Sequence, residues 1–235
     1  MFPLRDENHS ERAPWVTRAL IAINLAVFFY EISLGPGLPA FMQTWGLVPA
    51  HLSRALHGDA PLAGALAPLF TSVFLHGGWL HVIGNMWYLW IFGDNVEDRL
   101  GHAGFITFYL AAGLASGVLH TLVNGGSTVP TVGASGAIAG VLGAYLVIFP
   151  RARVITLVPV FVFIQIMSLP AVLVLGLWIV LQFFSGALSL AYDTAAHGGG
   201  TAWWGHIGGF LFGLMVGLLF RGSPPRDLRR FSEPA

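Results

Sequence analysis

Long apolar stretches separated by short polar or glycine-rich connections run through almost the whole chain. A helix that crosses a bilayer needs about 20 mostly apolar residues. Six stretches approach or reach this length, namely residues 16–34, 78–92, 104–123, 132–149, 170–190 and 203–220. The pattern therefore predicts an all-α polytopic membrane protein, built as a bundle of six transmembrane helices.

The connections between these stretches differ in character. Residues 35–77 contain five prolines and are too broken to span, so they predict an interfacial loop with short helices. Residues 93–99 predict a charged turn, and residues 124–127 predict a second turn. Pro159 interrupts residues 154–168, which would extend only about 22 Å as a helix. We therefore expect a re-entrant or interfacial segment there, with the fifth span starting at Pro170.

These elements divide the chain into three parts. Residues 1–15 predict a cytoplasmic N-terminal segment, residues 16–220 the six-helix membrane domain, and residues 221–235 a cytoplasmic tail. Within the domain, residues 192–202 form a glycine-rich loop before the last span. The polar N-terminus lacks an apolar core followed by a small-residue cleavage site, so the first span is expected to direct insertion itself.

Composition and charge support a membrane protein and suggest its orientation. Hydrophobic residues make up 55% of the chain and charged residues 9%, against about 25% charged residues in soluble domains. With six spans, only Arg54 falls on the outer side, as the positive-inside rule requires. The predicted cytoplasmic pieces hold the other arginines: Arg5, Arg12, Arg18, Arg99, Arg151, Arg153, Arg221, Arg226, Arg229 and Arg230. We expect a multi-pass protein of a plasma or bacterial inner membrane, with both termini cytoplasmic.

The same composition narrows the classes of partner and cofactor. Net charge is zero and no basic stripe is present, which argues against nucleic acid. The chain has no Cys and no His-Glu-x-x-His motif, so we expect neither a metal nor another cofactor. Membrane lipid is the expected surrounding. No pattern indicates the oligomeric state.

Four polar side chains interrupt the apolar spans, and polar groups inside a bilayer are costly enough to suggest function. They are His81, Asn85, Ser135 and His206. At 1.5 Å per helical residue, each lies about 21 to 27 Å above the nearest cytoplasmic arginine on its own helix. Three separate helices therefore carry these groups to one common layer in the outer half of the bilayer.

Small residues predict that two of these helices pack closely. The fourth span carries one glycine stripe and the sixth span another, and such spacings let backbones approach. If the stripes meet, Ser135 and His206 come within hydrogen-bond reach. The stripes are Gly136, Gly140 and Gly143 in the fourth span, and Gly209, Gly213 and Gly217 in the sixth.

These residue types together suit nucleophilic catalysis. A serine hydroxyl becomes a good nucleophile when a base takes its proton, and His206 can take the proton of Ser135 and later pass it to a leaving amine. His81, Asn85 and the backbone N–H of Ser135 are candidate donors to a developing oxyanion. No carboxylate is placed to orient His206, so the pattern predicts a Ser–His dyad.

Each of these residues alone has an ordinary structural interpretation. A serine near a helix start is commonly a cap or a small packing residue. A histidine below a tryptophan pair suits the interface, and a buried asparagine commonly bonds between helices. The functional interpretation rests on the four residues occurring together at one depth.

Four segments of the chain resemble the rhomboid intramembrane serine proteases. They lie within a resemblance that covers roughly residues 16–220. The segments are His-Gly-Gly-Trp-Leu-His-Val-Ile-Gly-Asn at 76–85, Phe-Gly-Asp-Asn-Val-Glu-Asp-Arg-Leu-Gly at 92–101, Gly-Ala-Ser-Gly at 133–136 and His-Ile-Gly-Gly-Phe-Leu-Phe-Gly at 206–213.

The resemblance implies a rhomboid-like six-helix core that cleaves membrane-anchored substrates near their outer ends. It implies Ser135 as nucleophile, His206 as general base, and oxyanion stabilisation by His81 and Asn85. Residues 192–201 would form a mobile cap over the site. Two departures stand out: Ala67-Pro68 replaces the Trp-Arg pair of many members, and Ala139 replaces a tyrosine that in some members packs on the histidine.

Two other functions are compatible with a polytopic membrane protein. A non-catalytic rhomboid-like protein that binds membrane clients normally lacks the serine or the histidine, whereas this chain has both. A transporter or channel would require matching broken spans in two halves, or charges along a path. The sequence contains neither feature, so an intramembrane serine endopeptidase is the leading hypothesis.

Overall fold

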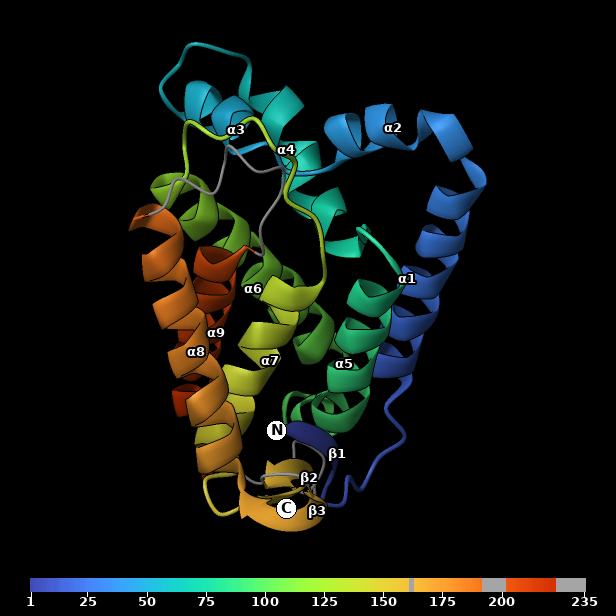
Figure 1. Ribbon diagram of the computed structural model, residues 1–235, viewed down its shortest axis with the longest axis vertical. Coiled ribbons are helices and arrows are strands. Elements are labelled where there is room, and N and C mark those ends of the chain that lie inside the picture. Colours follow the sequence, from blue (N-terminus) through green and yellow to red (C-terminus); the bar gives the residue numbers. More distant parts are fainter. Residues whose placement is uncertain (161–162, 192–201, 223–235) are drawn as a thin grey trace, which may run out of the picture.

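The computed structural model describes residues 1–160, 163–191 and 202–222, and its main body is a bundle of long helices (Figure 1). The long helices are α1 (Trp15–Ser33), α5 (Trp79–Leu100), α6 (His102–Val123), α7 (Ser135–Ile148), α8 (Ala171–Ala191) and α9 (Trp203–Phe220). All six predicted spans thus coincide with helices, and the fourth begins three residues later than expected.

Four of these helices, α1, α6, α8 and α9, have the length and composition of a membrane span on their own. The helix α5 qualifies only together with α4 (Leu62–Thr71) and η2 (Ser72–Phe74), with a bend of 79° between the two parts. The helix α7 is apolar but has only 14 residues. The protein is therefore an integral, all-α membrane protein, and α7, the fourth of its long helices, starts well inside the bundle.

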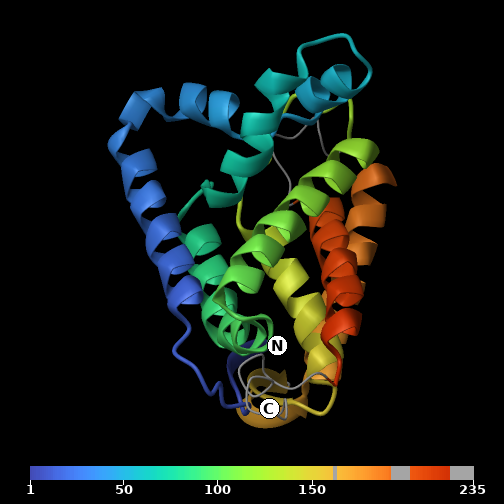
Figure 2. The same cartoon turned by 180° about the vertical axis from the view of Figure 1, so that it is seen from behind.

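The two ends of the bundle are built differently. At one end lie the short elements of the predicted interfacial loop, η1 (Gly35–Gly37), α2 (Leu38–Trp45), α3 (Pro49–Leu56) and α4 (Figure 1). The opposite end carries a three-stranded sheet and the N-terminus, and the view from behind shows the same separation (Figure 2). Arg54 belongs to α3, whereas Arg5 and Arg153 belong to the sheet, so these charges separate as the sequence predicts.

The sheet is a structure that the sequence pattern did not predict. Residues 154–168, expected to be a re-entrant or interfacial segment, fall in an antiparallel hairpin of β2 (Arg153–Val160) and β3 (Phe163–Pro170). Val and Ile dominate this stretch and favour strands. The N-terminal segment supplies β1 (Phe2–Asp6), which pairs with β2 from Val154 to Leu157. Pro159 lies beyond that pairing, so its missing N–H removes no bond to β1.

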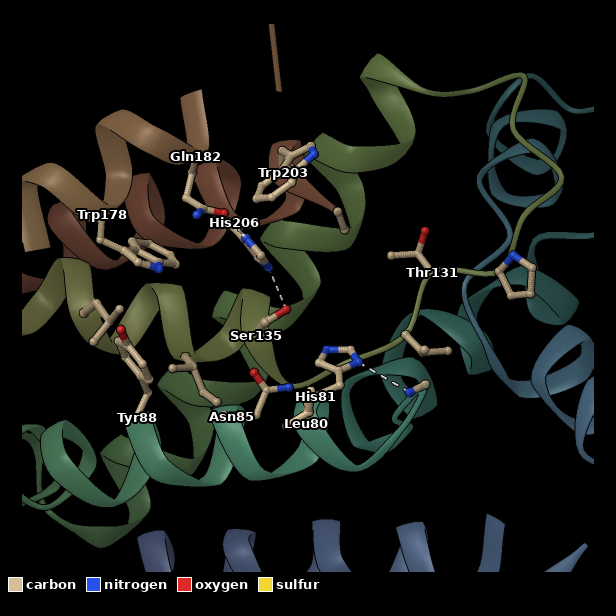
Figure 3. A pocket seen from close by; sticks show the side chains of 17 residues that line it. Leu80, His81, Asn85, Tyr88, Thr131, Ser135, Trp178, Gln182, Trp203 and His206 are labelled. Atoms are coloured by element: carbon tan, nitrogen blue, oxygen red, sulfur yellow. Dashed lines mark hydrogen bonds between the residues drawn. The ribbon is translucent and has the colours of Figure 1, made fainter. Parts of the chain in front are cut away.

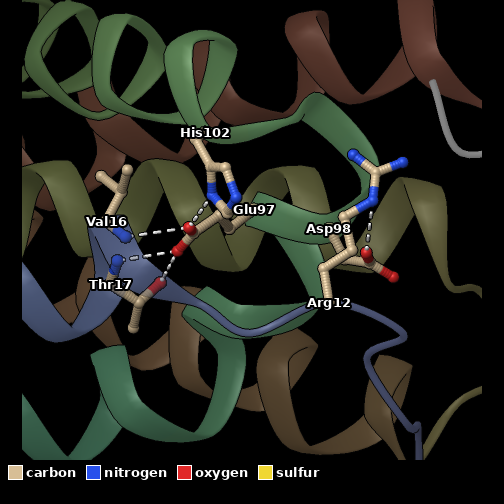
Figure 4. Close-up of polar contacts among 6 residues, drawn as sticks. All are labelled: Arg12, Val16, Thr17, Glu97, Asp98 and His102. Atoms are coloured by element: carbon tan, nitrogen blue, oxygen red, sulfur yellow. Dashed lines mark hydrogen bonds and ion pairs between the residues drawn. The ribbon is translucent and has the colours of Figure 1, made fainter. Parts of the chain in front are cut away.

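The predicted charged turn at residues 93–99 is wrong, because α5 continues to Leu100. Glu97 is 1% exposed, and its carboxylate accepts hydrogen bonds from the backbone N–H groups of Val16 at 2.9 Å and Thr17 at 2.7 Å (Figure 4). The Thr17 hydroxyl also donates to it at 2.6 Å. The Glu97 carboxylate caps the start of α1, and α1 supplies the hydrogen-bond donors that permit its burial.

The helix α7 forms the centre of the bundle, because eleven of its fourteen residues are buried. Its glycines meet those of α9 as predicted. A methyl group at Gly209 would overlap the carbonyl oxygen of Gly136, and one at Gly213 would overlap that of Gly140. Only glycine permits this backbone contact, which sets the distance between the two helices that carry Ser135 and His206.

Candidate active site

Ser135 is the first residue of α7, and the segment before it is bonded to the connection between α2 and α3 and to η2. The backbones of Leu47 and Thr131 exchange two hydrogen bonds, and the N–H of Gly133 donates to the carbonyl of Ser72 at 2.9 Å. Gly133 has φ of +131°, a conformation that favours glycine. The chain therefore enters α7 at a fixed point inside the bundle, with the Ser135 side chain beside the entry.

The close contact of α7 and α9 brings Ser135 and His206 together. Ser135 Oγ and His206 Nε2 lie 2.7 Å apart, a hydrogen-bond distance between residues 71 positions apart in the sequence (Figure 3). His206 is 7% exposed, and Ser135 is partly exposed. The hydroxyl is therefore accessible while its hydrogen-bonding partner is protected.

Three side chains surround the His206 ring. Its Nδ1 lies 2.5 Å from Oε1 of Gln182 on α8. The Trp178 ring, also on α8, lies 5.8 Å from the imidazole at an interplanar angle of 33°. Trp203 meets the imidazole edge-on at 6.3 Å. Ala139 stands where some members of the resembled family have a tyrosine that packs on the histidine. Here Trp178 and Trp203 provide the aromatic contacts with His206.

His81 and Asn85 face the same region from α5, one helical turn apart (Figure 3). The N–H of Gly77 donates to Nδ1 of His81 at 3.4 Å, which leaves Nε2 as the protonated nitrogen. A methyl group at Gly133 would lie 2.6 Å from this Nε2 and 3.5 Å from Ser135 Oγ. The His81 ring and the Ser135 hydroxyl therefore both lie beside Gly133. The buried amide nitrogen of Asn85 has no hydrogen-bond partner among the residues that the structure describes.

All four predicted residues line one cavity of about 670 Å³. Its wall is drawn from α5, α7, α8, α9 and the segment before α7 (Figure 3). Tyr88, Ile138 and Leu142 extend the lining beyond the polar groups. Most of the cavity wall is apolar and the polar groups gather at one place. Such a cavity suits an apolar peptide segment with a single peptide bond placed at the polar groups.

The structure brings together every site residue that the sequence predicts, and it adds Gln182, which the sequence analysis overlooked. Gln182 is the only amide in the 21 residues of α8, and a lone amide in an apolar span is itself a signal of function. The predicted cap at residues 192–201 lies outside the described residues. Pro68, which belongs to the Ala67-Pro68 departure, lies inside α4.

The fold and the site define a polytopic helical membrane protein with a hydrogen-bonded Ser–His pair at a cavity in its bundle. Residues 63–223 match the sequence profile of the Rhomboid domain. The chain belongs to the rhomboid family.

Several curated proteins are similar to this chain. The mouse (Mus musculus) "Presenilin-associated rhomboid-like protein, mitochondrial" is 33% identical over 154 residues, which cover 63% of this chain and 36% of that protein. The yeast (Saccharomyces cerevisiae) "Rhomboid protein 1, mitochondrial" is 28% identical over 221 residues, 92% of this chain and 56% of its own length. "RHOMBOID-like protein 5" of Arabidopsis thaliana is 30% identical over 191 residues, 81% of this chain and 53% of that protein. The chain therefore spans only about a third to a half of these relatives.

Proposed function

We propose that this protein is an intramembrane serine endopeptidase of the rhomboid type, which cleaves transmembrane-anchored proteins in the outer part of the bilayer. The observation that carries the proposal is the 2.7 Å contact between Ser135 Oγ and His206 Nε2 at an open cavity. A hydrogen-bonded serine and histidine form the minimal unit for acyl transfer.

The proposed reaction begins when His206 Nε2 takes the Ser135 proton as Oγ attacks the scissile carbonyl carbon. The oxyanion forms beside the unpartnered Asn85 amide, the Nε2–H of His81 and the N–H of Ser135 at the start of α7. His206 then gives its proton to the leaving amine as the C–N bond breaks. Water releases the acyl group by the same steps, and the proton returns to Ser135.

The position of the cavity supports this substrate class. Its walls belong to helices that carry exposed apolar side chains, and Leu80, which lines the cavity, is itself 89% exposed. In a bilayer such surfaces face lipid, so a transmembrane segment can reach the cavity from the side. A substrate segment must be extended at its scissile bond to meet Ser135, so we expect helix-destabilising residues there to favour cleavage.

For the membrane, we propose the bacterial inner membrane with both termini cytoplasmic, supported by the arginine distribution. The names of the mouse and yeast relatives contain the word mitochondrial, and a mitochondrial membrane is the alternative. Because the chain has no cysteine, single cysteines placed at Glu11 and Asp59 can report the orientation. Labelling by an impermeant reagent from the outside is expected at position 59 and not at position 11.

Cleavage by purified protein in liposomes tests the proposed activity. Wild type, Ser135→Ala and His206→Ala would be given a transmembrane substrate with a destabilised helix, and thermal melting would report folding. Ser33→Ala and His57→Ala, at exposed positions, serve as matched controls. Cleavage by wild type and both controls, but by neither site variant, is the expected result.

A folded wild type that neither cleaves nor reacts with a fluorophosphonate at Ser135 would contradict the proposal. A non-catalytic protein that binds membrane clients would then be the better hypothesis. Loss of activity in the two control variants would show that the assay reports folding rather than chemistry.

A further inference from the structure

Gln182 has the position of a third member of the reacting group. Its side chain is 8% exposed in a span where a buried amide needs a partner. The partner is His206 Nδ1 at 2.5 Å, on the side of the ring opposite to Ser135. The imidazole therefore has a hydrogen-bonding group at each nitrogen, one from α7 and one from α8.

The two contacts assign the tautomer of His206. A neutral imidazole has one N–H and one lone pair. The amide oxygen of Gln182 can only accept, so Nδ1 must carry the proton and donate it. This leaves the lone pair of Nε2 directed at the Ser135 hydroxyl, as a general base requires. The opposite tautomer would place an N–H against the serine proton and could not act.

We propose that Gln182 is a positioning residue that holds His206 in the reactive tautomer and orientation. The inference deepens the proposed function and rests on it, because it concerns the base of that reaction. Trp178 lies four residues earlier on the same face of α8 and packs on the ring. One turn of α8 therefore restrains the imidazole in two ways: Gln182 bonds a nitrogen at the ring edge, and Trp178 packs against the ring.

An amide in this position differs from a carboxylate. Gln182 is neutral, so it orients the imidazole without adding a negative charge to stabilise the imidazolium. Gln182→Glu retains an acceptor oxygen, and when ionised it favours the protonated ring. Gln182→Met retains the volume and removes the acceptor. Gln182→Met therefore tests the hydrogen bond at nearly constant packing, and Gln182→Glu tests the effect of a negative charge with the hydrogen bond retained.

Steady-state cleavage by the reconstituted variants as a function of pH is the kinetic test. Gln182→Met should lower kcat about 10- to 100-fold with little change in KM, because a hydrogen bond to a group that becomes charged is lost. Gln182→Glu should regain most of that rate, with the acidic limb of the pH profile moved to higher pH. Ser185→Ala, on the next turn of α8, is the control and should match wild type.

A purely structural role would impair both variants equally, in parallel with their melting temperatures, and would leave the pH profile in place. That result would overturn the inference while the proposed function stood. Unchanged kcat in a folded Gln182→Met would overturn it as well.

A measurement that needs no activity keeps the two proposals distinguishable. Nitrogen NMR of ¹⁵N-histidine-labelled protein, with His206 assigned by His206→Ala, reports which ring nitrogen is protonated. We expect protonated Nδ1 in wild type and a mixture of tautomers in Gln182→Met. The same tautomer in both proteins would refute the inference even if no substrate is cleaved.

Discussion

At the scale of the residue, Asn85 has the least ordinary environment in the site. Its amide nitrogen is buried without a partner in the described part of the chain, and such a group costs about 1–3 kcal/mol relative to a bonded one. Buried polar groups in spans normally find partners, so an exception requires an explanation. In the proposed reaction, the transient oxyanion would be this partner. The Asn85 amide would then bond the oxyanion more strongly than it bonds the carbonyl oxygen of the uncleaved substrate.

We therefore expect Asn85→Ala to lower kcat by about 10²–10³-fold with little effect on KM. The melting temperature should stay the same or rise, because the variant removes an unsatisfied donor. Kinetics and melting of the same preparation check both parts. Asn124→Ala, which alters an amide bonded to the His120 carbonyl at the end of α6, is the control for activity. A proportional rise in KM at constant kcat would contradict the oxyanion role.

At the scale of the element, the contact between α7 and α9 decides whether the site exists. The glycines at this contact leave no space for a methyl group, and the obstacle is backbone rather than a movable side chain. Any added volume must push the two helices apart. The distance between Ser135 and His206 depends on that separation, although neither residue belongs to the glycine stripe.

Gly213→Ala tests this dependence seven residues away from His206. Overpacking of this kind costs about 1–3 kcal/mol, so the melting temperature should fall and cleavage should fall with it. Gly176→Ala is the matched control, because Gly176 lies in α8 with open space around it. The control should be at least as stable as wild type, since alanine favours helix. A Gly213→Ala protein as stable as wild type would show that the contact is looser than described.

A second element-scale feature is the cap that α5 supplies to α1. Glu97 accepts the N–H groups of Val16 and Thr17, which would otherwise be unsatisfied at a buried helix start (Figure 4). His102 Nδ1 also lies 2.5 Å from this carboxylate. The cap fixes α1 to the bundle at one end only, far from the cavity.

Glu97→Ala should therefore lower stability by about 1–3 kcal/mol while kcat at low temperature stays near wild type. Chemical unfolding in detergent, together with cleavage measured well below the melting temperature, separates the two effects. Glu11→Ala, at an exposed position near the same end, provides the comparison and should change neither. Loss of kcat in a fully folded Glu97→Ala would place this cap in the function of the site.

At the scale of the whole molecule, the sheet ties the N-terminus to the hairpin between α7 and α8. Asp6, at the end of β1, accepts hydrogen bonds from the Tyr145 hydroxyl at 2.7 Å and the Asn95 amide at 2.8 Å. Burial raises the pKa of Asp6 to about 7; the bond from Tyr145 opposes this shift, and the carboxylate of Asp94 adds to it. The connection between β1 and the bundle is therefore sensitive to pH near neutrality.

The sign follows from linkage. The pKa of Asp6 is raised above its usual 3.8, so the folded state binds the proton more tightly than the unfolded state does. The resulting stability is complete below about pH 4 and is lost as pH rises through about 7. We expect the melting temperature of wild type to fall between pH 6 and pH 8 by more than that of Asp6→Asn. Asp59→Asn, at the opposite end of the bundle, should keep the wild-type dependence, and equal slopes for wild type and Asp6→Asn would refute the assignment.

Features that depend on a short stretch of sequence were predicted, and features that depend on contacts between distant parts of the chain were not. The sequence by itself determined the helices at residues 203–220 and 104–123, because continuous apolar stretches are sufficient for a span. It also singled out the four polar residues that the structure places at one cavity, since polar groups are conspicuous in such stretches. It misjudged residues 93–99, because charged residues ordinarily leave a helix, and only α1 shows how Glu97 is satisfied. It did not show that residues 154–168 form strands, because strand pairing with β1 joins parts of the chain about 150 residues apart.

The tertiary structure alone decided the details on which chemistry depends. Ser135 and His206 meet because two glycine stripes pack in one register, which the stripes allow but do not specify. Gln182 and Trp178 became recognisable only when α8 was placed beside α9, since hydropathy describes a helix and not its neighbour. Depth along each helix follows from the sequence through the fixed rise per residue, whereas rotation and packing partner depend on contacts between helices.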